Sequence, residues 1–180
     1  LGVPKNDAEA AKWYLKAAAG SINEAQEKVG EFYLAGRGFP KNSSKALIWF
    51  SRAGEQGNIR AQYMAGKMHK DGIGTPPSPG LAIRWHRMAA RRGHAASQFE
   101  VAGIIRNQKD IPNRFRVAEK WYRLAANQKH LEAGFMLARM NDQGEGIPKN
   151  PEEAFRWYQK IASRGHAGAM VKLGEIYLSG

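Results

Sequence analysis

The five tryptophans of this chain are separated by a constant interval of 36 residues. They are Trp13, Trp49, Trp85, Trp121 and Trp157. A proline column keeps the same step, at Pro4, Pro40, Pro76, Pro112 and Pro148. Self-similarity at a period of about 20–50 residues is typical of arrays in which one small unit stacks on its own copies. The 180 residues therefore predict five copies of one unit in a single array over 1–180.

Each period has the pattern of two helices joined by a short turn. Residues 130–143 carry apolar side chains at helical spacing, and the glycines and proline of 144–148 end that helix. Asn150 is suited to cap a second helix, with Glu153 three residues later completing a capping box. Residues of the capping type recur at Asn6, Asn42, Ser78 and Asn150. The pattern predicts an all-α fold of about ten helices with antiparallel neighbours.

A column of small residues and the tryptophan column both concern helix packing. A small residue recurs in the middle of each first helix, where glycine normally costs about 1 kcal/mol relative to alanine. These residues are Gly30, Gly66, Ala102, Ala138 and Gly174. Small side chains at these points predict close contact between helices, and the tryptophan column is predicted to be a structural core element between paired helices. The fourth period departs from the pattern, because Gln108 and Asp110 replace the paired glycines, so we expect either that the helix runs on there or that the turn changes shape.

The repeated motifs resemble the Sel-one-like repeat (SLR) family, which is related to the tetratricopeptide repeat. The resemblance rests on Ala61-Gln62, Ala65-Gly66, Gly72-Ile73-Gly74, Ala82, Trp85, Ala89-Ala90 and Gly93-His94, and it recurs along the whole chain. It implies a right-handed α-solenoid of antiparallel helix pairs that acts as a scaffold or adaptor for other proteins and not as an enzyme. Such proteins are common in bacterial signalling, envelope and host-interaction systems, which implies a soluble, exported or periplasmic protein. A secreted branch has one disulfide per repeat, and this chain departs from it because it has no cysteine.

The residues give no sign of catalysis or of a bound metal. His94, His130 and His166 share one column, so successive histidines are about 10 Å apart by helix-packing distances, too far to converge on one ion. The repeated Gly-x-Gly elements follow no strand, so they are turns and not dinucleotide fingerprints. We therefore expect no catalytic residue, no metal and no cofactor. No run of 18 apolar residues is present either, so no transmembrane helix is expected.

A candidate binding surface lies on the first helices, which line the concave face in the tetratricopeptide-like arrangement. Three neighbouring periods carry an aromatic residue at one position and basic residues one or two turns further on. This set consists of Tyr63, Phe99, Phe135, Lys67, Lys70, Arg106 and Arg139. Aromatic residues and arginine dominate interface energies, so the set predicts a site for a protein or peptide, acidic in character. The other interpretation is that these aromatic rings only fill space between helices.

The uneven charge suggests an alternative function. The net charge is +12, and residues 81–130 hold eleven basic but only three acidic residues. Such a field attracts nucleic acid or an anionic envelope polymer, and the stretch 84–123 is the predicted polyanion site under this alternative.

The two ends of the sequence complement each other. Residues 177–180 followed by 1–6 read like residues 33–42, so the chain is cut within the turn of a repeat. We therefore expect a fragment of a longer array, and we expect end-to-end self-association through the exposed terminal helices.

Overall fold

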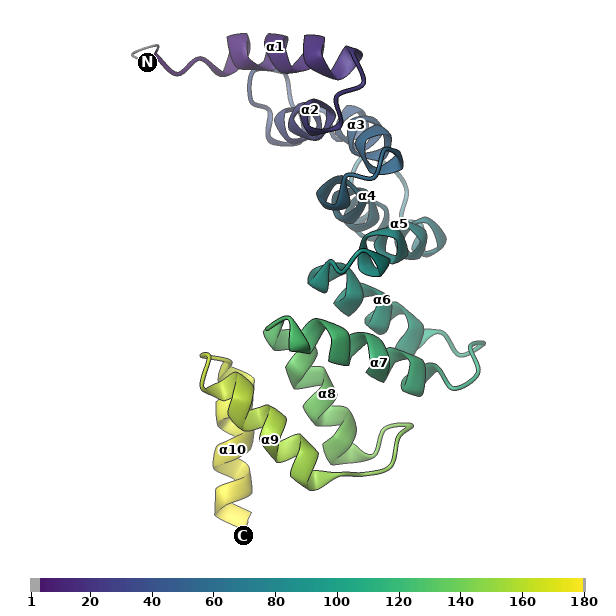
Figure 1. Cartoon of the computed structure of the whole chain (residues 1–180), viewed down its shortest axis with the longest axis vertical. Helices are drawn as coiled ribbons and strands as arrows, with labels where there is room; N and C mark the ends of the chain where they lie inside the picture. Colours follow the sequence, from purple (N-terminus) through teal and green to yellow (C-terminus); the bar gives the residue numbers. More distant parts are fainter. Residues whose placement is uncertain (1–3, 180) are drawn as a thin grey trace. The chain divides into compact units, whose positions relative to one another are not determined.

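A computed structural model of the chain describes residues 4–179, and this part contains ten α-helices and no β-strand (Figure 1). The helices fall into two compact units, up to Arg92 and from Gly93 onward. The first unit consists of α1 (Asp7–Ala19), α2 (Asn23–Ala35), α3 (Ser43–Glu55), α4 (Ile59–Asp71) and α5 (Pro79–Arg91). The second consists of α6 (Ala95–Asn107), α7 (Arg114–Asn127), α8 (Leu131–Gln143), α9 (Pro151–Ala162) and α10 (Ala167–Ser179). The predicted all-α fold of helix pairs is confirmed.

Within each unit, every helix packs against the next one in the chain. We call α2, α4, α6, α8 and α10 the first helices, and we call α1, α3, α5, α7 and α9, which carry the tryptophans, the second helices.

The predicted capping residues begin four of the second helices. The side chains of Asn42 and Asn150 accept hydrogen bonds from the backbone N–H three residues later, at 2.9 and 3.0 Å. Asn6 and Ser78 cap α1 and α5 in the same way. The capping box expected at Glu153 does not form. Its carboxylate instead accepts hydrogen bonds from the Trp157 indole and from Arg123, both at 2.9 Å.

The second glycine of each Gly-x-Gly turn lies directly against the start of the preceding second helix. Gly74 has a φ of +75°, and a Cβ placed on it would lie 2.5 Å from the Ser43 carbonyl. The Ser44 hydroxyl donates a hydrogen bond of 2.9 Å to the Gly74 carbonyl across the same contact. At the equivalent positions, a Cβ on Gly38 would lie against Asp7 and Ala11, and a Cβ on Gly146 would lie against Phe115. Glycine is therefore required both for its conformation and for the close approach of the turn.

Two of the mid-helix glycines, Gly30 and Gly66, lie in the close helix contacts that the sequence predicts, whereas a Cβ on Gly174 would meet no atom within 4 Å. A Cβ on Gly30 would lie 2.9 Å from the ring of Phe50, and a Cβ on Gly66 would lie 2.8 Å from the ring of His86. Both rings belong to the second helix of the same repeat and are fully buried. These two glycines thus allow α2 and α4 to approach their partner helices closely.

The tryptophan column is not uniformly buried. Trp85 and Trp157 are 8% and 7% exposed, and Trp49 and Trp121 are partly buried. The prediction of a buried core position is wrong for Trp13, which is 65% exposed. Trp85 packs against Gly54 at the end of α3, the preceding second helix. The described residues include no such helix before α1, so the Trp13 ring has nothing to pack against on that side.

Of the two alternatives predicted for the fourth period, the structure has the altered turn and not a longer helix. α6 ends at Asn107, followed by Gln108 in an extended conformation instead of a left-handed glycine. α7 then begins after Asn113, which has a φ of +54° and forms no side-chain capping bond. The helix therefore stops where the other first helices stop, but without the glycine turn that follows them.

Candidate partner-binding surface

A groove opens between the first helices α2 and α4 of the first unit. Its volume is about 370 Å³, and its apolar lining comes from Phe32, Leu34, Ala35 and Met64. Phe32 is buried in the core, whereas Leu34 and Met64 are partly buried and present part of their side chains to the groove. The groove is a shallow apolar hollow of the size that accepts one or two side chains of a bound segment.

Charged side chains at the edge of this groove are held in ion pairs. Arg60 contacts Glu31 at 2.7 Å and Glu27 at 3.4 Å, and so joins the two first helices. Arg37 donates two hydrogen bonds to Asp7, at 2.9 and 3.2 Å. The hydrogen bond from Arg37 lowers the pKa of the Asp7 carboxyl group below its ordinary value. The edge is therefore ordered and nearly neutral, and the apolar floor is its distinctive feature.

Three of the predicted binding residues lie on α4, the helix that contributes Arg60 and Met64 to the groove, but they are not among its lining residues. Lys67 and Lys70 are exposed, whereas Tyr63 is partly buried with its ring 5.7 Å from the His86 ring. Lys67 follows Met64 on the same helical stripe, because residues three and four apart share a face. Lys67 is thus placed to contact a segment that occupies the groove.

In the second unit, Phe99 and Phe135 both serve as packing residues between repeats. The Phe99 ring stacks on His130 with the ring centres 4.9 Å apart, and it also contacts Tyr122 at 5.7 Å. Phe135 repeats this arrangement with His166 at 4.6 Å. Both phenylalanines are partly buried. Each ring therefore supports the next repeat and leaves only part of its surface for a partner.

The basic residues predicted beside these rings differ in availability. Arg106 forms a bidentate ion pair with Glu145, with contacts of 2.8 and 2.9 Å. Its guanidinium fork is therefore already occupied by a carboxylate of this chain. Arg139 is partly buried on α8, one turn beyond Phe135. Tyr63, Lys67 and Lys70 belong to the first unit, and Phe99, Arg106, Phe135 and Arg139 belong to the second.

The histidine column has the structural role that its spacing predicts. Nδ1 of His94, His130 and His166 accepts a hydrogen bond from the backbone N–H three residues later, at 3.2, 3.2 and 3.1 Å. Each histidine therefore caps a first helix and needs an unprotonated Nδ1 to do so. Within residues 4–179, no group of three or more histidine or acidic side chains is arranged to hold a metal ion.

These capping histidines predict a loss of stability in mild acid. Burial lowers the pKa of His94 and of His130 below the ordinary value of about 6.5. The unfolded chain therefore binds protons below about pH 6.5 that the folded chain rejects, so the free energy of unfolding falls as the pH decreases. We expect the melting temperature to fall between pH 7.5 and pH 5.5.

The matched control is the double variant His94→Asn/His130→Asn, because asparagine keeps a capping oxygen that does not titrate in this range. Its melting temperature should vary less with pH than that of the parent chain. Some dependence should remain, since burial also lowers the pKa of His69. An unchanged pH profile in this variant would show that the caps do not titrate as described.

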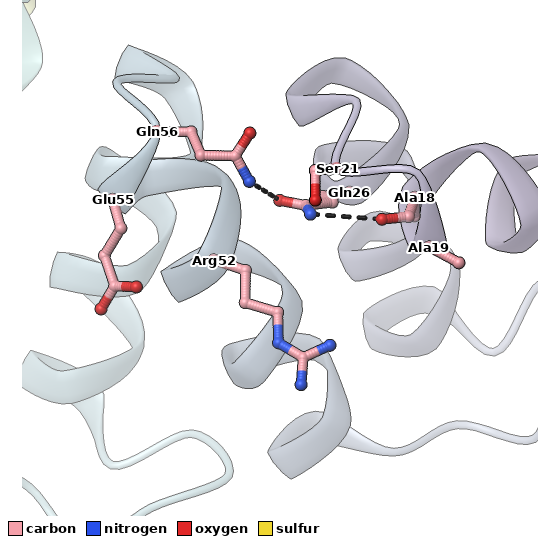
Figure 2. A pocket seen from close by; sticks show the side chains of 7 residues that line it. All are labelled: Ala18, Ala19, Ser21, Gln26, Arg52, Glu55 and Gln56. Atoms are coloured by element: carbon pink, nitrogen blue, oxygen red, sulfur yellow. Dashed lines mark hydrogen bonds between the residues drawn. The ribbon is translucent and has the colours of Figure 1, made fainter.

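A second hollow, also of about 370 Å³, is lined mainly by polar residues (Figure 2). Gln26 donates a hydrogen bond to the Ala18 carbonyl at 3.3 Å and accepts one from Gln56 at 2.9 Å. Gln62 donates in the same way to the Gly54 carbonyl at 2.8 Å. These buried glutamines bind the carbonyl groups at the ends of second helices, so we interpret this hollow as part of the helix-joining structure.

The groove residues Phe32, Leu34 and Met64 were missed by sequence reasoning. Phe32 belongs to an apolar column that repeats with the period, but Leu34 and Met64 fall in columns of mixed character, and the groove depends on how α4 is offset along α2, which the Arg60–Glu31 ion pair reveals. The glutamines at 26, 62 and 98 do repeat with the period, so a search for repeated polar columns would have found them.

Comparisons with known proteins agree with this architecture. The family model of the Sel1 repeat matches residues 1–21, 23–58, 59–94, 95–130 and 131–166. The structure is similar to that of a Sel1 repeat protein from Oxalobacter formigenes, with 30% identity and a TM-score of 0.83, over 96% of this chain and 50% of that one. It is also similar to c5321, a protective antigen of uropathogenic Escherichia coli with an SLR fold, with 27% identity and a TM-score of 0.55, over 97% and 45% of the two chains.

An immunity protein, Pa5087 from Pseudomonas aeruginosa, shares the fold at 20% identity and a TM-score of 0.55, over 93% of this chain and 62% of that one. A search of curated proteins gave no match. The chain thus spans about half the length of the first two structures it resembles. Within residues 4–179, the helices are too short or too polar to cross a bilayer. Sel1 repeat proteins are generally scaffolds for protein interactions, and with five matched repeats and ten helices in this arrangement, the chain belongs to the Sel1 repeat family.

Proposed function

We propose that this chain is a non-catalytic scaffold that binds a segment of a partner protein on the face of its first helices. The observation that carries the proposal is the groove between α2 and α4, where an apolar floor lies among ion-paired side chains. Such a hollow suits one apolar anchor of a bound segment, and the exposed Lys67 one turn from Met64 suits an acidic residue beside that anchor. In the tetratricopeptide-like arrangement that the family resemblance implies, the first helices line the concave face.

The aromatic residues of the second unit have a secondary part in this proposal. Phe99 and Phe135 are partly exposed on first helices, so a longer partner segment would contact their free edges. Their stacking on His130 and His166 means that an alanine substitution would also remove contacts between repeats. Variants of the groove are therefore the cleaner test.

The variant Met64→Glu should lose most of its binding to the partner proteins that the unsubstituted chain, called the parent chain below, retains in a pull-down. A carboxylate on the groove floor, even when paired with Arg60 four residues earlier, would replace the apolar surface that the anchor of the bound segment needs, and we expect affinity to fall by about tenfold or more. The matched control is Ile48→Glu on α3, which is 51% exposed and outside the groove. Equal binding by Met64→Glu and the parent chain, with Ile48→Glu also unchanged, would exclude the groove as the site.

The alternative, a polyanion bound along residues 84–123, has less support because part of that charge is neutralised. Arg106 is paired with Glu145, and Arg123 is paired with Glu119 at 2.8 Å and with Glu153 at 2.9 Å. Salt dependence separates the two functions. Binding to a phosphate polymer should weaken steeply and log-linearly with salt concentration, whereas binding through an apolar anchor should weaken only mildly.

A further inference from the structure

The second helix α5 differs from the rest of the chain in its charge. No acidic residue occurs between Asp71 and Glu100, a segment that contains all of α5. Arg84, Arg87 and Arg91 are all exposed on this helix. They lie three and four residues apart, so they share one side of the helix. We call this set, together with Leu81 and Met88, the arginine face.

Two of the three equivalent cations on other second helices are ion-paired within their own helix, whereas the third, Lys120 of α7, has no ion pair among the residues that the structure describes. Lys12 and Arg156 occupy the position of Arg84 in their repeats, and they contact Glu9 at 2.7 Å and Glu152 at 3.7 Å. The residues of α5 that correspond to these two glutamates are Leu81 and Gly80.

The position of Arg87 shows the same contrast. Its equivalent in α7 is Arg123, which is paired with Glu119 and Glu153. α5 has the buried Ile83 in place of Glu119. Within the first unit, no carboxylate of the residues that the structure describes lies within ion-pair distance of Arg84, Arg87 or Arg91. These three arginines therefore remain available to an outside anion.

The arginine face also has an apolar part. Leu81 is 40% exposed and Met88 is partly buried, and both lie on the same side of α5 as Arg84 and Arg91. From Arg84 to Arg91 the axial distance is about 10 Å, since a helix rises about 1.5 Å per residue. Glutamates at positions i, i+3 and i+7 of a facing helix have the same spacing. Arginine binds carboxylates through two parallel hydrogen bonds, which favours such a paired arrangement.

We propose that the arginine face binds an acidic, amphipathic helix of a partner protein. Its carboxylates would pair with Arg84, Arg87 and Arg91, and its apolar residues would cover Leu81 and Met88. A single-stranded nucleic acid fits this surface less well, because it requires aromatic side chains on which bases stack. The aromatic rings of α5, Trp85 and His86, are both buried. The arginine face is on a second helix, away from the residues that line the α2–α4 groove, so the two binding proposals can fail separately.

The test compares two triple variants that remove the same charge from the same unit. Arg84→Gln/Arg87→Gln/Arg91→Gln alters the arginine face. Lys16→Gln/Lys41→Gln/Lys45→Gln removes three exposed cations from α1, α3 and the turn before α3. The probe is a synthetic peptide of glutamate, leucine and alanine with glutamates on one helical face. A peptide of the same composition with scattered glutamates and a twenty-nucleotide thymidine strand serve as competitors. Circular dichroism melts verify that both variants fold.

We expect the patterned peptide to bind the parent chain about tenfold more tightly than the scattered one, as three ion pairs of ordinary strength would give. The arginine variant should lose this preference, and the lysine variant should keep it. The proposal is overturned if both variants lose affinity equally, if the two peptides bind alike, or if the thymidine strand binds more tightly than the patterned peptide. Met64→Glu should leave binding of this peptide unchanged, whatever its effect on the groove.

Discussion

Replacing Trp85 with alanine is expected to lower the free energy of unfolding by about 3–5 kcal/mol, the usual cost of truncating a large buried side chain. Trp85 is 8% exposed, and its ring edge packs against Gly54. The substitution therefore removes the contact between a second helix and the end of the preceding one. Urea denaturation followed by far-ultraviolet circular dichroism measures the change without depending on tryptophan fluorescence.

Trp13→Ala is the matched control, because it removes the same side chain from the same column. The Trp13 ring is 65% exposed, so its loss should cost less than about 1 kcal/mol. Equal losses of unfolding free energy in the two variants would show that the tryptophans do not stabilise the fold through burial against the preceding repeat.

Gly74→Ala is expected to destabilise the first unit by about 3 kcal/mol or more. A side chain disfavours the φ of +75° by about 1–2 kcal/mol, and the added methyl group would collide with the backbone of Ser43. Backbone atoms at the start of α3 cannot move aside as a flexible side chain can. The turn would have to leave α3, and the hydrogen bond from Ser44 to Gly74 would break.

The variant Gly93→Ala separates the cost of the positive φ from the cost of the collision with the backbone. Gly93 has a φ of +89°, and a Cβ there would meet no atom within 4 Å. This variant should cost only the conformational part, about 1–2 kcal/mol. If thermal denaturation shows similar losses for both variants, the close contact between the turn and α3 contributes nothing measurable.

The sequence predicted those parts of the fold that local chemistry determines. The caps at Asn42 and Asn150 follow from side-chain chemistry next to the helix start, and the packing of Gly30 and Gly66 follows from a small residue repeated with the period. The exposure of Trp13 could not be read from its column, because burial depends on a neighbouring repeat and not on the residue itself.

The candidate site was less predictable than the fold. Arg106 is basic in the sequence, but its charge is neutralised by Glu145, 39 residues later, across a turn whose path the sequence does not specify. The α2–α4 groove likewise depends on the offset of two helices. The availability of the α5 arginines, by contrast, follows largely from the absence of acids between Asp71 and Glu100, which is visible in the sequence.

The central claim is that partner proteins bind to the first-helix face of the first unit. The most direct test replaces one residue with a photo-crosslinking amino acid, either Met64 in the groove or Ile48, which is exposed on α3. Each variant is irradiated together with the partners retained in the pull-down, and the covalent adducts are mapped by mass spectrometry. We expect abundant adducts from position 64 and few from position 48. Equal yields from the two positions, or adducts from position 48 alone, would contradict it.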